Sequence, residues 1–326
     1  MTTAGLPFVQ GDRDVLQVLV ARREAGSAPG ARTDAHRVAL VIGGGGMRGS
    51  YAAGMLRALQ EQGLTRAFDE VYGSSSGALL AAAFVTGGAA GAAESYAEDM
   101  TTREFIDMRR LGSRRPVLAL NYLLDDIMGD RRPLDWDALG TTPAALHLVA
   151  TDTADLTAHT LTGMTGRADW RQALAASATI PLLAGPPAEF GGRRWVDGSV
   201  AEPLATARAI RGGATHVLVM LCRGAADRGP EPGPRMPLWA RGLDRVAAGL
   251  GTLSQGSRRY GAELRLVTEP EHPLRGTARL AAIAPESSSG VGSLTVEREL
   301  VAAAVEIGAG SALRAVQAAE RDQRAA

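Results

Sequence analysis

Residues 71–80 constrain the fold most, because an apolar strand there meets a helix across five small residues. Gly73 and Gly77 stand two positions before and after Ser75. A strand that turns at once into a helix strains its central residue, and only small flanking residues let the two arms pass so closely. The pattern G-x-S-x-G is typical of a nucleophile elbow, in which the central serine points out of the sheet. Ser75 is therefore the candidate nucleophile.

A second strand–loop–helix unit lies just upstream. Residues 38–42 form a continuous apolar run, which is expected of a strand buried on both faces of a parallel sheet. Four glycines follow at 43–46, and residues 50–62 have helical spacing. Bare glycine N–H groups at a helix start can face an anion. This loop is the candidate oxyanion hole for an acyl-transfer serine, and it comprises Gly44, Gly45, Gly46, Met47, Arg48 and Gly49.

The alternation of apolar runs with helical patterns predicts an α/β fold with three α/β/α layers and a mainly parallel central sheet. With 45% hydrophobic and 21% charged residues, the chain can bury a sizeable core. Further strands are expected at 145–150, 215–221, 264–267 and 279–283, with 156–162 as the hairpin partner of the first. Further helices are expected at 89–106, 170–177 and 294–319.

The predicted organisation is one large domain with a short preceding segment. Residues 1–36 read as an N-terminal extension and linker that contains a short amphipathic helix at 14–23. Residues 37–320 form a single hydrolase domain, with a motif-bearing part at 38–210 and a C-terminal part at 211–320. The proline-rich stretch 229–237 is expected to be a surface loop.

Composition limits the partners and the compartment. The 35 basic residues balance the 35 acidic ones, which gives no argument for a nucleic-acid partner. The start lacks the basic region of a signal peptide, and no segment approaches the ~20 apolar residues of a membrane span. We therefore expect a cytoplasmic protein. The single cysteine, Cys222, excludes an internal disulfide and a cysteine metal site, so we expect neither a metal nor another cofactor.

Four motifs in order resemble the patatin-like phospholipase family. Residues 44–49 resemble its G-G-G-x-R/K-G loop, and residues 73–77 resemble its G-x-S-x-G elbow. Residues 176–181 resemble its small-residue segment ending in proline. Asp197-Gly198 resembles its D-G-G/A motif, from which this chain departs with Ser199 in the third position. The similarity covers about residues 38–210, and residues 211–320 resemble the C-terminal part of the bacterial branch less specifically.

The resemblance implies a serine lipid acyl hydrolase with a Ser75–Asp197 dyad. Its substrate would be a lipid or acyl ester, and through that substrate it would contact a membrane peripherally. Asp197 would be the proton acceptor. An aspartate near its reference pKa of ~3.9 is a weak base, but burial can raise that pKa. Without the other motifs, Asp197 would be interpreted as an ordinary turn aspartate that hydrogen-bonds its own backbone. Asp152, also at a strand end, is the reserve candidate for the base.

Two alternatives to the Ser75–Asp197 dyad remain. One has the same catalytic serine, and the other has the same fold. The first is a Ser-His-Asp α/β-hydrolase, with Ser75, then Asp152 or Asp197, then His216 or His272. The second is a catalytically weak lipid-binding or regulatory module of the same fold. The intact Ser75 and Asp197 argue against this module.

A dinucleotide-binding protein is a further alternative, because Gly44, Gly46 and Gly49 also match G-x-G-x-x-G. That fingerprint requires an acid at the end of the second strand. Here Asp69 and Glu70 precede the apolar residues of the second strand.

The apolar stretch 117–127 is flanked by arginine-rich residues at 109–115 and 131–132. We expect a core helix with solvated ends. The alternative is a cap over an acyl-chain groove, extending over residues 109–135.

Overall fold

The computed structural model describes residues 6–227, 238–254 and 257–325. In this part of the chain nine strands form one sheet, and its centre is parallel. The parallel strands, in spatial order, are β9 (Arg279–Ile283), β8 (His216–Met220), β2 (Val38–Ile42), β3 (Glu70–Ser74) and β4 (Ala145–Asp152). The other strands are antiparallel. β1 (Val9–Gly11) pairs with β9 at one side of the sheet. At the other side, β7 (Arg193–Asp197) and β5 (Ala158–Thr160) pair with β4, and β6 (Ala188–Phe190) pairs with β7.

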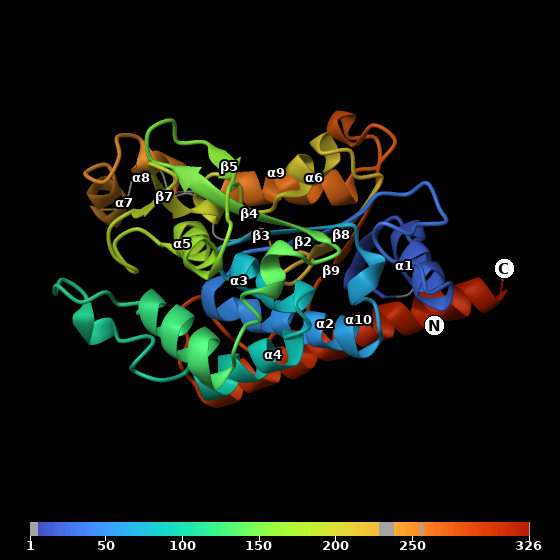
Figure 1. Cartoon of the computed structure of the whole chain (residues 1–326), viewed down its shortest axis with the longest axis horizontal. Helices are drawn as coiled ribbons and strands as arrows, with labels where there is room; N and C mark the ends of the chain where they lie inside the picture. The colour runs from blue at the N-terminus through green and yellow to red at the C-terminus, as the bar shows by residue number, and fades with distance from the viewer. Residues whose placement is uncertain (1–5, 228–237, 255–256, 326) are drawn as a thin grey trace.

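Helices cover both faces of this sheet (Figure 1). One layer holds α1 (Asp14–Glu24), α2 (Gly49–Glu61), α3 (Ser76–Val85), α4 (Ala89–Glu98) and the long α10 (Arg298–Ala325). The other holds α6 (Thr206–Arg211) and α9 (Ser257–Thr268). The predicted three-layer α/β fold with a mainly parallel sheet is confirmed. Further helices are α5 (Arg167–Ala178), α7 (Leu238–Leu243), α8 (Leu250–Leu253) and a π-helix at Tyr122–Arg131.

Two glycines let α2 and α10 touch backbone to backbone. A Cβ atom on Gly54 would lie 1.9 Å from the carbonyl oxygen of Val305. A Cβ atom on Gly308 would lie 2.0 Å from the carbonyl oxygen of Tyr51. No side chain fits at either position, so these glycines fix how closely the C-terminal helix packs on the helix that follows the glycine loop.

The described part of the N-terminal segment packs into the body of the molecule, where the sequence had predicted an extension and linker. Strand β1 extends the sheet beside β9, and α1 begins close to the predicted residue 14. Most of its large apolar side chains, including Val15 and Leu19, are fully buried. Arg22 is also buried, where it ion-pairs with Asp34 and Asp69.

Most of the other predicted elements are present, with shifted ends. The strand at 279–283 and the hairpin partner of β4 are confirmed. The strand predicted at 264–267 is wrong, because these residues belong to α9. So short an apolar run suits a helix face as well as a strand. The predicted helix 89–106 ends at Glu98, and the loop predicted at 229–237 lies outside the described residues.

Candidate active site

Ser75 joins β3 to α3 with φ +57° and ψ −136°, a backbone conformation that residues other than glycine rarely adopt. The close approach of strand and helix explains the glycines around it. A Cβ atom on Gly73 would lie 2.4 Å from the carbonyl oxygen of Gly77, and one on Gly77 would lie 2.3 Å from that of Ile42. Both positions therefore require glycine. The strain is concentrated at one serine, as is usual at functional sites.

The segment at 176–181 holds both Ser75 and Asp197. The carbonyl oxygen of Ser177 accepts from the N–H of Ser75 at 3.0 Å, and that of Thr179 accepts from the N–H of Asp197 at 2.8 Å. The turn after Asp197 also lies directly on the elbow strand. A Cβ atom on Gly198 would lie 3.0 Å from the Cβ of Ser74. These contacts bring Asp197, far along the chain, to the side of Ser75.

Asp197 is a buried carboxyl with one occupied oxygen and one open oxygen. Its Oδ1 accepts from the Ser199 N–H at 2.8 Å and from the Ser199 hydroxyl at 2.6 Å. Its Oδ2 accepts no hydrogen bond from the described residues. Burial raises the pKa of Asp197 above its ordinary value, while the hydroxyls of Ser199 and Ser75 act in the opposite direction. The carboxyl is therefore a stronger base than an exposed aspartate, and the Ser75 hydroxyl is close enough to influence it.

Several N–H groups of the glycine loop are already engaged. The N–H of Gly45 donates to the Ser76 hydroxyl at 3.0 Å. The N–H of Met47 donates to the carbonyl oxygen of Ser293 at 3.0 Å, and that of Arg48 donates back within the loop at 3.2 Å. These bonds fix the loop to the start of α3 on one side and to the C-terminal part of the chain on the other.

Two loop amides remain open. Across residues 6–227, 238–254 and 257–325, the N–H groups of Gly44 and Gly46 donate to no other described residue. Gly44 also faces the elbow, since a Cβ atom there would lie 2.9 Å from the Cβ of Ser75. Gly46 has φ +57°, and a Cβ atom there would lie 2.5 Å from the carbonyl oxygen of Ser293. Neither glycine can be replaced without strain or a steric clash.

Arg48 and Gly49 lie at the start of α2. A Cβ atom on Gly49 would lie 2.2 Å from the hydroxyl of Tyr96, so that position also requires glycine. The side chain of Arg48 is half-buried, and its Nε has no hydrogen-bond partner in the described part of the chain. Burial, and secondarily the neighbouring Arg223, lower the pKa of Arg48 below its ordinary value.

Five residues contribute to the site in ways that the sequence alone does not predict. In the sequence Ser199 is only a departure from the D-G-G/A motif, and no pattern links Tyr96 to the site. Ser177 and Thr179 contribute backbone oxygens, which no residue pattern reveals. The contact of Ser293 with the loop joins residues more than 240 positions apart, and no local signal marks it.

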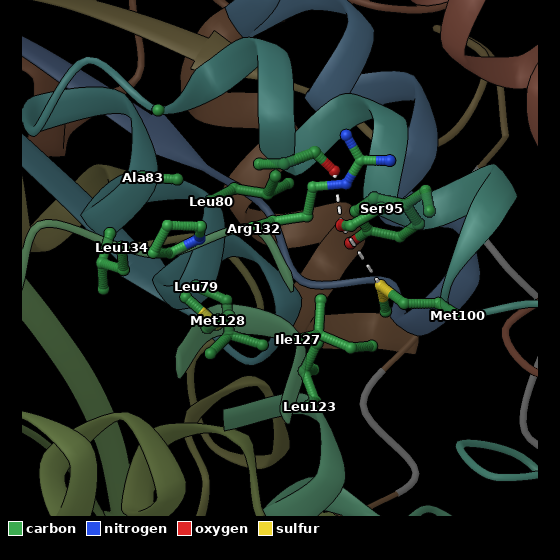
Figure 2. Close-up of a pocket in the computed structure, with 14 residues that line it drawn as sticks. Leu79, Leu80, Ala83, Ser95, Met100, Leu123, Ile127, Met128, Arg132 and Leu134 are labelled. Carbon is green, nitrogen blue, oxygen red and sulfur yellow. Dashed lines mark hydrogen bonds between the residues drawn. The ribbon is translucent and has the colours of Figure 1, made fainter. Parts of the chain in front are cut away.

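An apolar cavity opens beside Ser75. It is lined by side chains from the stretch 100–123, the glycine loop, α3 and residues 178–184. A second apolar cavity adjoins it, and Leu79, Met100 and Leu123 line both. Figure 2 shows the second cavity, with Ile127, Met128 and Leu134 among its walls. Counted together with their parts that are open to solvent, the two cavities measure about 440 and 490 Å³.

The histidines of the Ser-His-Asp alternative lie away from the elbow. His216 begins β8 and pairs in register with Val38, the first residue of β2, whereas Gly73 pairs with the last. His216 is thus at the opposite edge of the sheet from Ser75. His272 accepts from the N–H of Leu274 in a separate turn.

The acids of the dinucleotide alternative are also at the opposite edge and are occupied. Asp69 binds Arg22 and Arg32, and Glu70 ion-pairs with Arg37. Neither carboxylate faces the glycine loop, which follows the other end of β2.

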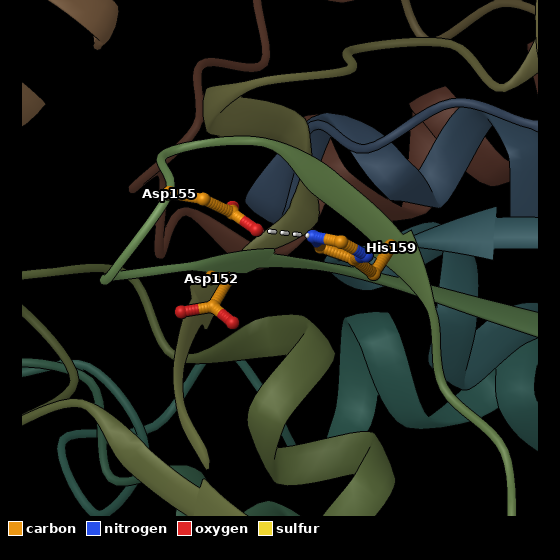
Figure 3. Close-up of side chains that lie close together, drawn as sticks. All are labelled: Asp152, Asp155 and His159. Atoms are coloured by element: carbon orange, nitrogen blue, oxygen red, sulfur yellow. Dashed lines mark hydrogen bonds and ion pairs between the residues drawn. The ribbon is translucent and has the colours of Figure 1, made fainter.

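Asp152, the reserve base, belongs to a separate cluster with Asp155 and His159 on the β4–β5 hairpin (Figure 3). These side chains have the ligand types of a metal site. Arg193, however, ion-pairs with Asp152 at 2.5 Å and with Asp155 at 3.3 Å, and His159 bonds Asp155 at 2.9 Å. Both acidic groups therefore already have a cationic partner within the protein.

Comparison with known proteins identifies the family. The family model of patatin-like phospholipase matches residues 40–210, slightly more than half of the chain. The chain therefore belongs to the patatin-like phospholipase family. Among the described residues, no helix is both long and apolar enough to cross a bilayer.

Two individual proteins are similar. The uncharacterized protein YjjU of Escherichia coli (strain K12) is 26% identical over 187 residues, which are 56% of this chain and 51% of YjjU. The chain thus spans about half the length of that relative. The crystal structure of VipD from Legionella pneumophila superimposes with a TM-score of 0.47 at 13% identity, over 87% of this chain and 67% of VipD.

Proposed function

We propose that the protein is a serine lipid acyl hydrolase, of the phospholipase A or esterase type, that uses a Ser75–Asp197 dyad. The observation that carries the proposal is the pairing of a strained, buried serine with a buried carboxyl. The pKa of that carboxyl is raised and one of its oxygens is open. The apolar cavity beside Ser75 supports an acyl chain as the substrate group. Every step of such chemistry can be assigned to residues of this chain.

Acylation begins when Asp197 Oδ2 takes the proton of the Ser75 hydroxyl. The serine oxygen attacks the ester carbonyl carbon, and the electron pair of the carbonyl bond moves onto its oxygen. The open N–H groups of Gly44 and Gly46 stabilise that negative charge, with the positive end of α3 beside it. When the intermediate collapses, the carbon–oxygen bond to the alcohol breaks. Asp197 returns its proton to the leaving alcohol.

Deacylation repeats the sequence with water. Asp197 takes a proton from a water molecule, which attacks the acyl carbon bound to Ser75. The second intermediate collapses, releases the fatty acid, and returns the proton from Asp197 to the serine oxygen. The other loop residues, Met47 and Arg48 among them, act through the shape of the loop, since their N–H groups are already bonded.

Labelling with a fluorophosphonate probe tests the nucleophile directly. We expect the wild-type protein to react at Ser75, and Ser75→Ala to lose both labelling and ester hydrolysis. Ser74→Ala is the matched control, because it removes the neighbouring hydroxyl of the same elbow. Peptide mapping of the labelled serine gives the readout. Equal labelling of wild type and Ser75→Ala would reject the assignment.

Asp197→Asn tests the base. The change keeps the shape and removes the basicity, so hydrolysis should fall by about 10²–10⁴-fold. Because burial raises the pKa of this carboxyl, its ionised form destabilises the folded state above that pKa. The variant should therefore be at least as stable as the wild type at neutral pH, as measured by thermal unfolding. If Asp152→Asn abolishes hydrolysis instead, the base has been misassigned.

A further inference from the structure

The segment between Phe105 and Leu118 leaves the body of the molecule and returns to it at a closed base. Ile106 forms an isolated antiparallel bridge with Leu118, and the N–H of Asp107 donates to the carbonyl oxygen of Val117 at 3.0 Å. Between these contacts, residues 108–116 project from the left side of the molecule in Figure 1. We call residues 103–116 the arginine loop. Its base and its tip face different surroundings.

The base of the arginine loop is a wall of the proposed acyl site. Phe105, Ile106 and Leu118 are buried, and all three line the cavity beside Ser75. The loop is therefore fixed to the mouth of the cavity. A lipid surface that binds the tip of the loop would lie next to the cavity that leads to Ser75.

The tip of the loop carries a local excess of positive charge on a chain that is neutral overall. Five arginines stand against the acidic pair Glu104 and Asp107. Asp107 is held by Arg109 and Arg110. The remaining arginines, Arg103, Arg114 and Arg115, are exposed, and their side chains form no ion pair within the described ranges. Guanidinium groups in this position are free to bind phosphate oxygens.

Exposed apolar side chains gather at the same rim. The described chain has six large hydrophobic side chains that are exposed, and three of them are here. Met108 and Leu111 lie on the loop tip, 50% and 63% exposed, and Leu182 is 47% exposed. The carbonyl oxygen of the neighbouring Leu183 accepts from the N–H of Leu118 at 2.9 Å, which places the backbone of Leu182 next to the base of the loop. Leu182 also has a left-handed backbone, with φ +66°.

We propose that the arginine loop and Leu182 form the surface with which the protein docks on an anionic phospholipid bilayer. Apolar side chains interleaved with arginines are the pattern expected of an interfacial segment, because the former enter the acyl region while the latter contact phosphates. In this pose the mouth of the cavity beside Ser75 opens onto the membrane. The orientation rests on the proposed acyl hydrolase function, whereas the docking itself does not.

Flotation with lipid vesicles tests the docking. The experiment uses the Ser75→Ala variant, because it should not hydrolyse the vesicle lipid. We expect binding to vesicles of equimolar phosphatidylcholine and phosphatidylglycerol, and weak binding to phosphatidylcholine alone. Raising the salt from ~0.1 to ~1 M should weaken binding, because the screening length falls from ~10 to ~3 Å. Binding that is equal on the two kinds of vesicle would overturn the proposal.

Two charge-matched variants locate the surface. Arg114→Gln with Arg115→Gln should weaken binding to the anionic vesicles roughly 10- to 30-fold, because each arginine near such a surface contributes about fivefold. The control is Arg13→Gln with Arg66→Gln, two exposed arginines outside the loop, which should bind as the parent does. An equal loss in both pairs would show a general charge effect and reject the loop.

A second pair tests the apolar contribution. Leu111→Ser should weaken vesicle binding by roughly tenfold, since it removes one large apolar side chain that would be buried in the acyl region of the bilayer. Leu274→Ser, a change at a position that is 58% exposed on another turn, should have no effect. If the parent instead self-associates through the loop without binding vesicles, as shown by sedimentation, the surface belongs to a second copy and the proposal is wrong.

The readouts separate this inference from the proposed function. Vesicle binding by Ser75→Ala needs no hydrolysis, so it survives if Ser75 proves unreactive toward the probe. Conversely, the Arg114→Gln/Arg115→Gln variant made with Ser75 intact should retain wild-type hydrolysis of a soluble short-chain ester and lose hydrolysis of vesicle lipid. An equal loss on both substrates would contradict a docking role.

Discussion

At the residue scale, the chain departs from the family pattern at Ser199, and this serine contacts the proposed base. A glycine or alanine at this position has no hydroxyl, whereas Ser199 donates its hydroxyl to Asp197 Oδ1 at 2.6 Å. This bond favours the charged carboxylate and partly opposes the effect of burial on its pKa. The same bond engages Oδ1, whereas Oδ2 has no hydrogen-bond partner among the described residues. If Asp197 is the base, as proposed, Ser199 is placed to orient it and to set the pH at which it becomes active.

Ser199→Ala should therefore raise the pKa of Asp197 further. The base acts when it is deprotonated, so the acid limb of the kcat/KM profile should move to higher pH, by about one unit. Activity at low pH falls, and activity well above the new pKa is largely kept. Ser199→Thr, which retains the hydroxyl, serves as the control. Profiles with acid limbs at the same pH would show that the hydroxyl does not tune the base.

At the element scale, the π-helix Tyr122–Arg131 has features of both predicted alternatives for residues 109–135, a core helix and a cap over an acyl-chain groove. Leu124 and Ile127 are fully buried, as expected of a core helix. The same helix also forms a wall of the apolar cavities, as expected of a cover over an acyl groove. Leu123 lies where the two cavities meet, together with Leu79 and Met100. The proposed acyl chain would pass this point if it extends beyond the first cavity.

Leu123→Trp should shorten the accepted chain. A bulkier side chain at the junction denies the second cavity to the end of a long acyl group, and each methylene left unburied costs about 0.8 kcal/mol. We expect kcat/KM for a long-chain ester to fall at least roughly tenfold, with little change for a butyryl ester. Tyr122→Trp, on the same helix but outside both cavity linings, is the control. An equal fall for both esters would indicate general damage to the site.

At the scale of the whole molecule, late parts of the chain hold the early motifs in place. Ser293 accepts from Met47 in the glycine loop, and the hydroxyl of Tyr51 accepts from the N–H of Ser289. Helix α10 packs directly on α2, which begins at the end of that loop. The loop's shape therefore depends on residues well beyond the motif-bearing part of the chain.

Gly308→Ala tests this dependence. Glycine to alanine normally favours a helix by about 1 kcal/mol. Here the new methyl group would meet the backbone of α2 at 2.0 Å, so we expect a net loss of about 1–3 kcal/mol in urea unfolding, with lower hydrolysis. Gly310→Ala, on the same helix, meets only the movable guanidinium of Arg314 and should be neutral or stabilising. Equal stability of the two variants would reject tight α2–α10 packing.

The sequence alone determined the class of fold and the elbow. Continuous apolar runs such as 38–42 suit strands that are buried on both faces of a parallel sheet, and the spacing of Gly73, Ser75 and Gly77 matches one kind of turn. Both are local consequences of backbone sterics and hydrophobic burial, so they can be read without knowing the partners. Asp197 as the base came from its resemblance to a motif, because an Asp-Gly pair by itself indicates only a turn.

Only the tertiary structure decided which groups surround Ser75. The carbonyl oxygens of Ser177 and Thr179, the occupied amides of the loop and the contact from Ser293 arise where distant segments meet, and backbone atoms leave no trace in residue identity. The raised pKa of Asp197 likewise depends on burial by the whole fold. The same limit applies to residues 264–267, whose apolar spacing fits a strand or a helix until packing of α9 selects one.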